Sequence, residues 1–217
     1  MGMDGVRSLS PMDHHFVQEM DLWADIPSEA ARRIIQGAAD SFALRGFHAT
    51  TTRDISASSG LSPAAMYVHF SSKEELLFEI TRRGHEDVLD LAETILGSDG
   101  PPDRRVRDFV YAFSRWHAEH HDIARVAQYE IAALSDDHAE VVGALRFKIS
   151  QLARTAISEG VDAGVFDFAD VPGVTTAVLS LGIDIARWFR PGGHYTPDGV
   201  GHLYSVLVLR MLGYEGV

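Results

Sequence analysis

The chain has 217 residues, no cysteine and a formal net charge of −12, and 46% of its residues are hydrophobic. That length suits one small and one larger domain, and the hydrophobic content is sufficient for a packed core. The lack of cysteine excludes disulfides, thiol nucleophiles and cysteine-ligated zinc, which suits a reducing compartment. No secretory signal is visible, and Asp184, Arg187, His202 and Arg210 keep the most apolar segments short of the ~18 residues of a membrane span. We therefore expect a cytoplasmic protein without a membrane segment.

Residues 1–26 are predicted to form a flexible or loosely docked tail, because they are rich in Asp, Glu, His and Met. Phe16, Val17, Met20 and Trp23 have the spacing of a small amphipathic turn, which is the alternative for this segment.

A first helix is predicted from about Pro27 to Arg45. Apolar residues recur there at the spacing of one helix face, and these are Ile34, Ile35, Ala38, Ala39 and Phe42.

A second, short helix is indicated by its capping residues. Thr51 can serve as the N-cap, with Asp54 placing negative charge in the first turn. Ile55 supplies the buried side, and Gly60 suits the left-handed position that ends a helix.

A third helix follows after a tight turn. Ser62 can cap it, Pro63 suits its first turn, and it is expected to end near Phe70. Ser72 and Glu75 then form a capping box for a fourth helix. Two short helices separated by a glycine-containing turn have the spacing of a helix-turn-helix, whose second helix can enter a major groove.

This region resembles the DNA-binding domain of the TetR family of bacterial transcriptional regulators over roughly residues 27–80. The matching residues are Gly46-Phe47, Thr51-Thr52-Arg53-Asp54-Ile55, Gly60-Leu61-Ser62, Tyr67, His69, Phe70, Lys73 and Glu74. The resemblance implies a helix-turn-helix DNA-binding domain over residues 27–75, and a helical ligand-binding and dimerisation domain over residues 76–217. It also implies a homodimer that binds a palindromic double-stranded operator, more often as a repressor than as an activator. The basic N-terminal arm common in the family is absent here, which leaves a minor-groove contact by residues 1–26 in doubt.

The residues predicted to contact DNA lie at the starts of the second and fourth helices and along the third. They are Thr51, Thr52, Arg53, Ser62, Ala64, Ala65, Tyr67, His69 and Lys73. Small alanines allow a close approach to base edges, and Tyr67 and His69 can donate to phosphates. Hydroxyls at a helix N-terminus also suit a phosphate. For Arg53 and Lys73 the alternative is a solvated surface position.

The negative charge is unevenly distributed. Residues 27–78 carry five Lys or Arg and five acids, whereas residues 79–217 carry a net charge of −8. Phosphate attraction is screened over ~8–10 Å, so an acidic distal region is compatible with DNA binding. The charge also keeps open a helical interaction protein that does not bind DNA.

Beyond residue 80 the chain is predicted to be all helix, giving an all-α fold. Breaks are expected at Gly97–Pro102, Gly160–Gly164, Pro172 and Pro191–Gly193. The predicted helices are the fourth to Leu96, then Asp103–His120, Asp122–Leu134, Ser135–Glu159, Gly173–Arg190 and Thr196–Leu212.

The last two helices are apolar on most faces, so they should be buried on most faces. The resemblance implies that they pair with their copies in a dimer. The residues predicted to form that interface are Val178, Leu181, Ile185, Leu203, Val206, Leu207 and Arg210.

The run from Arg187 to Gly193 resembles a branch of the family that senses acyl-CoA thioesters in lipid and sterol breakdown. That implies a small apolar effector, with arginines for the CoA phosphates. The candidate ligand-binding residues are Phe113, Arg115, Trp116, Tyr129, Arg187, Trp188 and Arg190. An alternative for Arg187 and Arg190 is pairing with acids at the helix end, and for the aromatic residues it is simple core packing.

A metal-sensing regulator is a further alternative, because His117, His120 and His121 have the spacing of one helix face. Asp122 or Glu130 could complete such a site, but solvated histidines at a helix end explain the pattern equally well. No nucleophile elbow, phosphate loop or His-Glu-x-x-His motif is present, so we expect neither an enzyme nor a cofactor.

Overall fold

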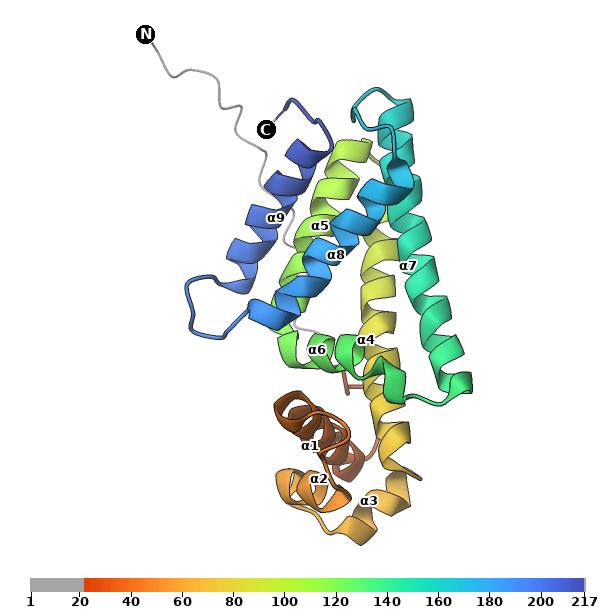
Figure 1. Cartoon of the computed structure of the whole chain (residues 1–217), viewed down its shortest axis with the longest axis vertical. Coiled ribbons are helices and arrows are strands. Elements are labelled where there is room, and N and C mark those ends of the chain that lie inside the picture. Colours follow the sequence, from red (N-terminus) through yellow and green to blue (C-terminus); the bar gives the residue numbers. More distant parts are fainter. Residues whose placement is uncertain (1–21, 217) are drawn as a thin grey trace. The chain divides into compact units, whose positions relative to one another are not determined.

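The computed structural model describes residues 22–216, and this part of the chain is entirely helical (Figure 1). The predicted all-α class is confirmed. In chain order the elements of the described range are α1 (Glu29–Arg45), α2 (Thr52–Ser59), α3 (Pro63–His69), α4 (Lys73–Leu96), α5 (Pro102–Glu119), α6 (His121–Tyr129), the 3₁₀ helix η2 (Ile131–Ala133), α7 (Asp136–Asp162), α8 (Val171–Trp188) and α9 (Pro197–Met211).

The described helices divide into two compact units, neither of which is one continuous stretch of chain. We call residues 22–89 together with 120–147 the head unit, and residues 90–119 together with 148–216 the body unit. Helices α4 and α7 each begin in the head unit and end in the body unit. The head unit therefore holds α6 and the start of α7 as well as α1 to α3.

The head unit has a single apolar core. Ser28 caps α1 by accepting the N–H of Ala31, and the face of α1 predicted to be apolar is buried. The largest side chains that are fully buried in this unit are Ile34, Ile35, Phe42, Ile55, Met66, Leu76, Leu77 and Ile80. They come from α1 to α4, so the short helices α2 and α3 are stabilised mainly by this shared core rather than by their own propensity.

Residues 22–26 pack onto the head unit and are not part of a flexible tail. Leu22, Trp23 and Ile26 are buried, and the Trp23 indole N–H donates to Gln36 on α1 at 2.8 Å. Arg83 of α4 forms an ion pair with Asp25 in the same stretch. The rest of the predicted tail, residues 1–21, lies outside the described residues.

The body unit is built around α5, which packs against α8 and α9. Glycines allow both approaches, because the Phe113 ring lies against Gly182 and the Tyr111 ring lies against Gly201. The Tyr111 hydroxyl also donates to Asp198 at 2.9 Å. Burial and this hydrogen bond raise the pKa of Tyr111 to about 12, so the phenol stays protonated and keeps α5 joined to α9.

Most predicted helix boundaries agree with the structure to within a few residues, and two differ for a clear reason. The helix predicted over Asp122–Leu134 ends at Tyr129 and is followed by the separate turn η2. Pro172 does not break the chain but lies in the first turn of α8, where no backbone N–H is needed. None of the described helices combines the length and hydropathy needed to cross a lipid bilayer.

Candidate nucleic-acid interface

The predicted helix-turn-helix is present as α2, a short turn and α3. The Thr51 hydroxyl accepts the N–H of Asp54, and the Asp54 carboxylate accepts the N–H of Thr51, which completes a capping box. Gly60 ends α2 in the left-handed conformation with φ of 66°. The Ser62 hydroxyl caps α3 by accepting the N–H of Ala65 at 3.2 Å. The turn is therefore fixed by local hydrogen bonds at both helix ends.

Asp54 carries the negative charge of the α2 cap, and its neighbours stabilise that charge. Its hydrogen bonds with the Thr51 hydroxyl and N–H, together with Arg45 at 2.5 Å, hold the pKa of Asp54 at about 2. The ordinary value for this carboxyl is 3.8. The ion pair joins the end of α1 to the start of α2, so it also orients the two helices.

We expect the head unit to lose stability as the pH falls from about 4 to about 2. A folded pKa below the unfolded one means that the ionised carboxylate of Asp54 stabilises the fold above about pH 4, and that this contribution disappears as the pH falls through about 2. Thermal unfolding of the wild type and of Asp54→Asn across this range tests the expectation. The gap between their unfolding temperatures should be clear at about pH 7 and should close near pH 2. A gap that is independent of pH would show that the charge contributes nothing.

Helix α3 offers a largely exposed surface for DNA. Met66 is its buried anchor, whereas Ser62 and Ala64 are exposed and Tyr67 retains 55% of its accessible surface. Of the remaining predicted contacts, Thr51 and Arg53 are exposed and the others, namely Thr52, Ala65 and His69, are half-buried. The structure thus brings the predicted DNA-contact residues of α2 and α3 into one small region of the head unit.

One exposed residue of α3 is missing from the sequence-based set. Val68 retains 78% of its surface, more than Tyr67 beside it. It lies four residues after Ala64, so the two share a helix face, and that spacing was the signal available in the sequence.

Lys73 has a different position from the one predicted. Its ammonium donates to the backbone carbonyls of Phe47 and Thr50, both at 2.8 Å, and lies over the Phe47 ring. Burial lowers the pKa of Lys73, and the charge of Glu130 opposes that shift. The side chain therefore holds the α1–α2 connection to the start of α4, and its contact with DNA stays a prediction.

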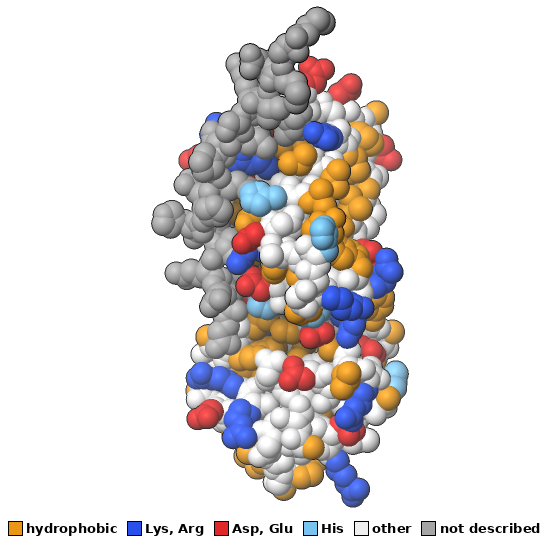
Figure 2. Space-filling model, turned by 90° about the vertical axis from the view of Figure 1, so that its left-hand side faces the viewer, with side chains coloured by type: hydrophobic (Ala, Val, Ile, Leu, Met, Phe, Trp, Pro, Cys, Tyr) orange, Lys and Arg blue, Asp and Glu red, His pale blue; other side chains and the backbone are white. Residues whose placement is uncertain are grey.

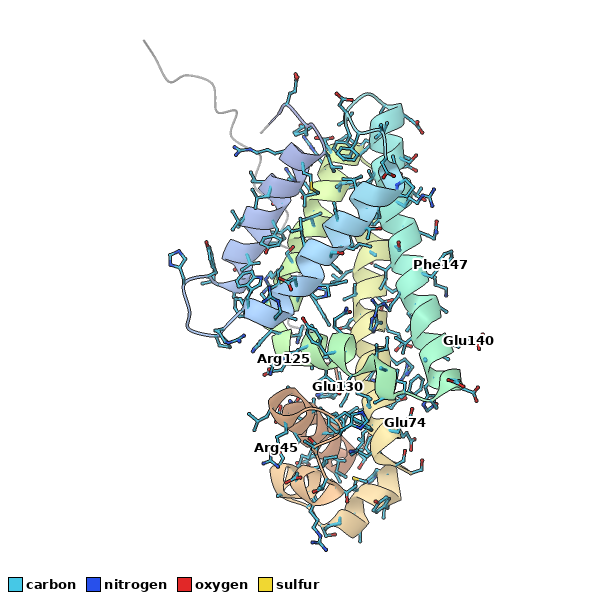
Figure 3. All side chains as sticks on the ribbon, in the orientation of Figure 1. Arg45, Glu74, Arg125, Glu130, Glu140 and Phe147 are labelled. Carbon is cyan, nitrogen blue, oxygen red and sulfur yellow. The ribbon has the colours of Figure 1, made fainter. Side chains whose placement is uncertain are left out.

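The start of the predicted ligand-binding region packs on the DNA-binding helices within the head unit (Figure 3). Arg125 of α6 donates to the carbonyl of Ala43 on α1 at 2.5 Å. Glu74 of α4 accepts the N–H of Ser135 at 2.9 Å and contacts His138 at 2.8 Å. The His138 ring stacks on Phe78, with 3.7 Å between centroids. These contacts hold α1 and α4 to α6 and α7, a connection that sequence spacing did not reveal.

The candidate ligand-binding residues do not converge on one described site. Phe113 and Trp116 are buried core residues of the body unit, and Arg115 is paired with Asp198 at 2.8 Å and Glu119 at 3.1 Å. Tyr129 belongs to the head unit and is 54% exposed.

The arginines near the end of α8 have local partners. Arg187 pairs with Asp184 at 2.7 Å, as the alternative interpretation proposed. Arg190 donates to the backbone carbonyls of Arg187 and Phe189. Trp188 is half-buried and stacks against Tyr204 of α9.

The predicted dimer residues fall into two groups. Val178 and Ile185 are buried inside the body unit, Ile185 against Ala118 and Val200, so they are core residues that a partner cannot reach. The exposed apolar members are Leu181, Leu203 and Leu207, while Val206 is half-buried and Arg210 is exposed. Figure 2 faces the α9 side and shows hydrophobic side chains gathered in a stripe along the body unit.

The histidine pattern does not form a metal site in the described part of the chain. Among residues 22–216, no three His, Asp or Glu side chains are grouped closely enough to hold a metal ion. His117 is buried, and its Nδ1 lies 2.8 Å from the carbonyl of Phe113. These contacts do not favour the metal-sensing alternative.

Two family models match the chain. One, described as bacterial regulatory proteins of the tetR family, covers residues 34–80, and one described as the tetracyclin repressor-like C-terminal domain covers residues 99–212.

Similar proteins agree with both matches. The transcriptional repressor KstR2 of Mycolicibacterium smegmatis is 30% identical over 191 residues, covering 85% of this chain and 93% of that protein. The crystal structure of a tetR-family regulatory protein from Rhodococcus RHA1 is 37% identical with a TM-score of 0.79, covering 85% of this chain and 97% of that one. The structure of the ketosteroid transcriptional regulator KstR2 of Mycobacterium tuberculosis is 28% identical with a TM-score of 0.79, and the match covers 86% of this chain and 95% of that one. The capped helix-turn-helix and both matched regions show that this chain belongs to the TetR family of transcriptional regulators.

Proposed function

We propose that this chain is a transcriptional repressor that binds a palindromic operator as a homodimer and is released by a small apolar effector. The observation that carries the proposal is α3 itself, a short helix capped at Ser62, anchored by Met66 and otherwise open to a partner. A two-fold dimer would present two such helices to half-sites about 34–36 Å apart. We also propose that it acts in the cytoplasm, where it would meet operator DNA, and we assign it no catalytic role.

Phosphate contacts are proposed for the groups that flank α3. Thr51 and Thr52 lie at the start of α2, Arg53 is exposed in its first turn, and Tyr67 and His69 can donate from α3. Ala64, Ala65 and the capping residue Ser62 allow the helix to approach the bases closely.

Tyr67→Phe is expected to weaken operator binding about thirtyfold, because one hydroxyl-to-phosphate hydrogen bond contributes roughly 1 kcal/mol and the dimer loses two of them. Because the Tyr67 side chain is exposed, loss of its hydroxyl should not affect folding. Tyr129→Phe is the matched control, since Tyr129 is equally exposed in the same unit but lies on α6. Fluorescence anisotropy with labelled operator measures both variants. Equal affinity for Tyr67→Phe and the wild type would remove Tyr67 from the interface.

We propose an acyl-CoA thioester, of fatty-acid or steroid origin, as the effector class. Support comes from the Arg187–Gly193 run and from the similarity to a protein described as a ketosteroid regulator. Arg187 and Asp184 are both largely exposed, and such a pair contributes at most about 1 kcal/mol. A CoA phosphate could therefore replace the carboxylate as the partner of Arg187 at little cost.

Gel-shift binding to the DNA around the protein's own gene tests the whole proposal. We expect a specific complex that is released by one thioester and not by the corresponding free acid. A specific complex that resists every fatty-acyl and steroid-derived thioester would keep the repressor and reject the effector class. The absence of any specific complex, on this DNA or on duplexes selected from a random pool, would reject the repressor itself.

A further inference from the structure

The most exposed large hydrophobic side chain of α3 is Val68, which keeps 78% of its accessible surface. Ala64 precedes it by one helical turn and is also exposed, so their methyl groups form one ridge on the helix. Met66 and Phe70, on the opposite side, are buried in the head unit. The ridge therefore takes no part in the core of the head unit, because the core contacts of this segment are made by Met66 and Phe70.

No side chain of α3 can form a bidentate hydrogen bond with a base edge beside this ridge. Helix α3 contains no Lys, Arg, Asn or Gln, which are the side chains that form bidentate contacts with guanine or adenine. The Ser62 hydroxyl oxygen accepts the N–H of Ala65 in the helix cap, and Pro63 has no N–H to donate. Ala64 and Val68 offer methyl groups alone.

We propose that Val68, with Ala64, determines operator sequence by packing against the C5-methyl groups of thymines in the major groove. This inference rests on the proposed function, because it assumes that α3 is the recognition helix. Thymine is the one base that presents a methyl group in the major groove. The exocyclic amines of adenine and cytosine would lose water against the ridge without gaining an acceptor, which disfavours them at the same position.

The positions of the polar side chains support a separation between the residues that contact phosphates and the residues that read bases. Thr52 and Arg53 lie on α2 with Thr51 at its N-cap, and Tyr67 and His69 flank the ridge on α3, so phosphate contacts and base reading use different side chains. Phosphate contacts position the helix, and the apolar ridge then selects among sequences.

Thymine-to-uracil scanning tests the inference on duplexes that the full-length wild type selects from a random pool. Replacing a thymine by deoxyuridine removes only the C5-methyl group. When the contacted thymine is replaced in one half-site only, we expect about fourfold weaker binding by the wild type, the loss associated with uncovering one methyl-sized group. Val68→Ala changes both half-site contacts, so it should bind the unmodified duplex about sixteenfold more weakly. It should also be insensitive to uracil at that position, as coupled partners are in a double-mutant cycle.

Two further variants control for shape and folding. Val68→Thr keeps the branched shape but exchanges a methyl for a hydroxyl, so it should also lose part of the uracil sensitivity. Val141→Ala changes an exposed valine on α7 and should bind every duplex as the wild type does.

The possible failures are distinguishable. If Val68→Ala retains the wild-type uracil profile, or if no uracil weakens wild-type binding, the methyl-reading role is overturned while the selected duplexes still support the repressor. If the wild type selects no duplex, both the repressor and this inference are overturned. Unchanged melting temperatures of the variants exclude unfolding as the cause of any loss.

Discussion

Gly37→Ala is expected to destabilise the head unit by about 1–3 kcal/mol, although glycine-to-alanine changes usually strengthen a helix by up to about 1 kcal/mol. Gly37 lies in α1 where the end of α2 crosses it. An added Cβ would lie 2.9 Å from the Ser59 nitrogen and 3.2 Å from the Ile55 carbonyl oxygen. Both neighbours are backbone atoms of α2, so relief of the clash requires that the helix itself move.

The consequence of that movement is larger for function than for folding. Arg33 donates to the Ser59 carbonyl at 2.7 Å, so the same contact region fixes the end of α2 and the turn that leads to α3. A displaced α2 carries Thr51, Arg53 and the orientation of α3 with it. We expect operator affinity to fall at least tenfold, because small errors in the placement of a recognition helix disturb many contacts at once.

Gly143→Ala provides the matched control. Gly143 also lies inside a helix, α7, but an added Cβ would meet no atom within 4 Å. The helix-propensity gain should then appear undiminished, as a stabilisation of about 0.5–1 kcal/mol. Calorimetric unfolding of the two variants should give shifts of opposite sign. Stabilisation by both changes would show that α2 does not approach α1 as closely as the structure describes.

Local chemistry explains why the helix-turn-helix could be predicted from the sequence. The capping box of Thr51 and Asp54, the left-handed Gly60 and the cap at Ser62 each depend on residues within four positions of one another. Such signals need no knowledge of the fold, and all three are present in the structure. The capping box predicted for Ser72 and Glu75 forms only in part, because the Ser72 hydroxyl accepts the N–H of Glu75 whereas the Glu75 carboxylate accepts the N–H of Ser71.

Contacts between distant residues explain what the sequence did not reveal. In the sequence Lys73 has the pattern of a surface cation, but in the fold its ammonium donates to the backbone carbonyls of Phe47 and Thr50. Arg115 resembles a free anion-binding group, yet its partner Asp198 is 83 residues away in the chain. In both cases the residues next to the charged side chain in the sequence do not indicate which distant group it pairs with.

Helix α8 shows a different limit. It is apolar on most of its circumference, so periodicity could not separate the buried face with Val178 and Ile185 from the exposed face with Leu181. Only the packing of α5 and α9 against it makes that distinction. The predicted interface residues of α8 therefore divide between the buried face, with Val178 and Ile185, and the exposed face, with Leu181, and the interface itself stays a prediction.

Replacing Leu203 and Leu207 together with glutamate is expected to abolish the dimer and to lower operator affinity at least a hundredfold. The two leucines lie one turn apart on α9, and Leu207 retains 48% of its accessible surface. In a two-fold interface each substitution occurs twice, so the double variant removes four leucines and introduces four carboxylates. Each buried leucine contributes about 1.5–3 kcal/mol, and an unpaired carboxylate in the interface adds a desolvation cost.

The effect on DNA binding follows from linkage between the two half-sites. A dimer binds both halves of a palindrome at once, whereas a monomer binds one half with no help from the second. Sedimentation velocity and anisotropy measure the two losses separately. Phe147→Glu is the control, since Phe147 is an exposed apolar residue of α7, outside α8 and α9 (Figure 3). A double variant that remains dimeric would place the interface elsewhere, and one that is monomeric but binds the operator at full affinity would separate dimerisation from DNA recognition.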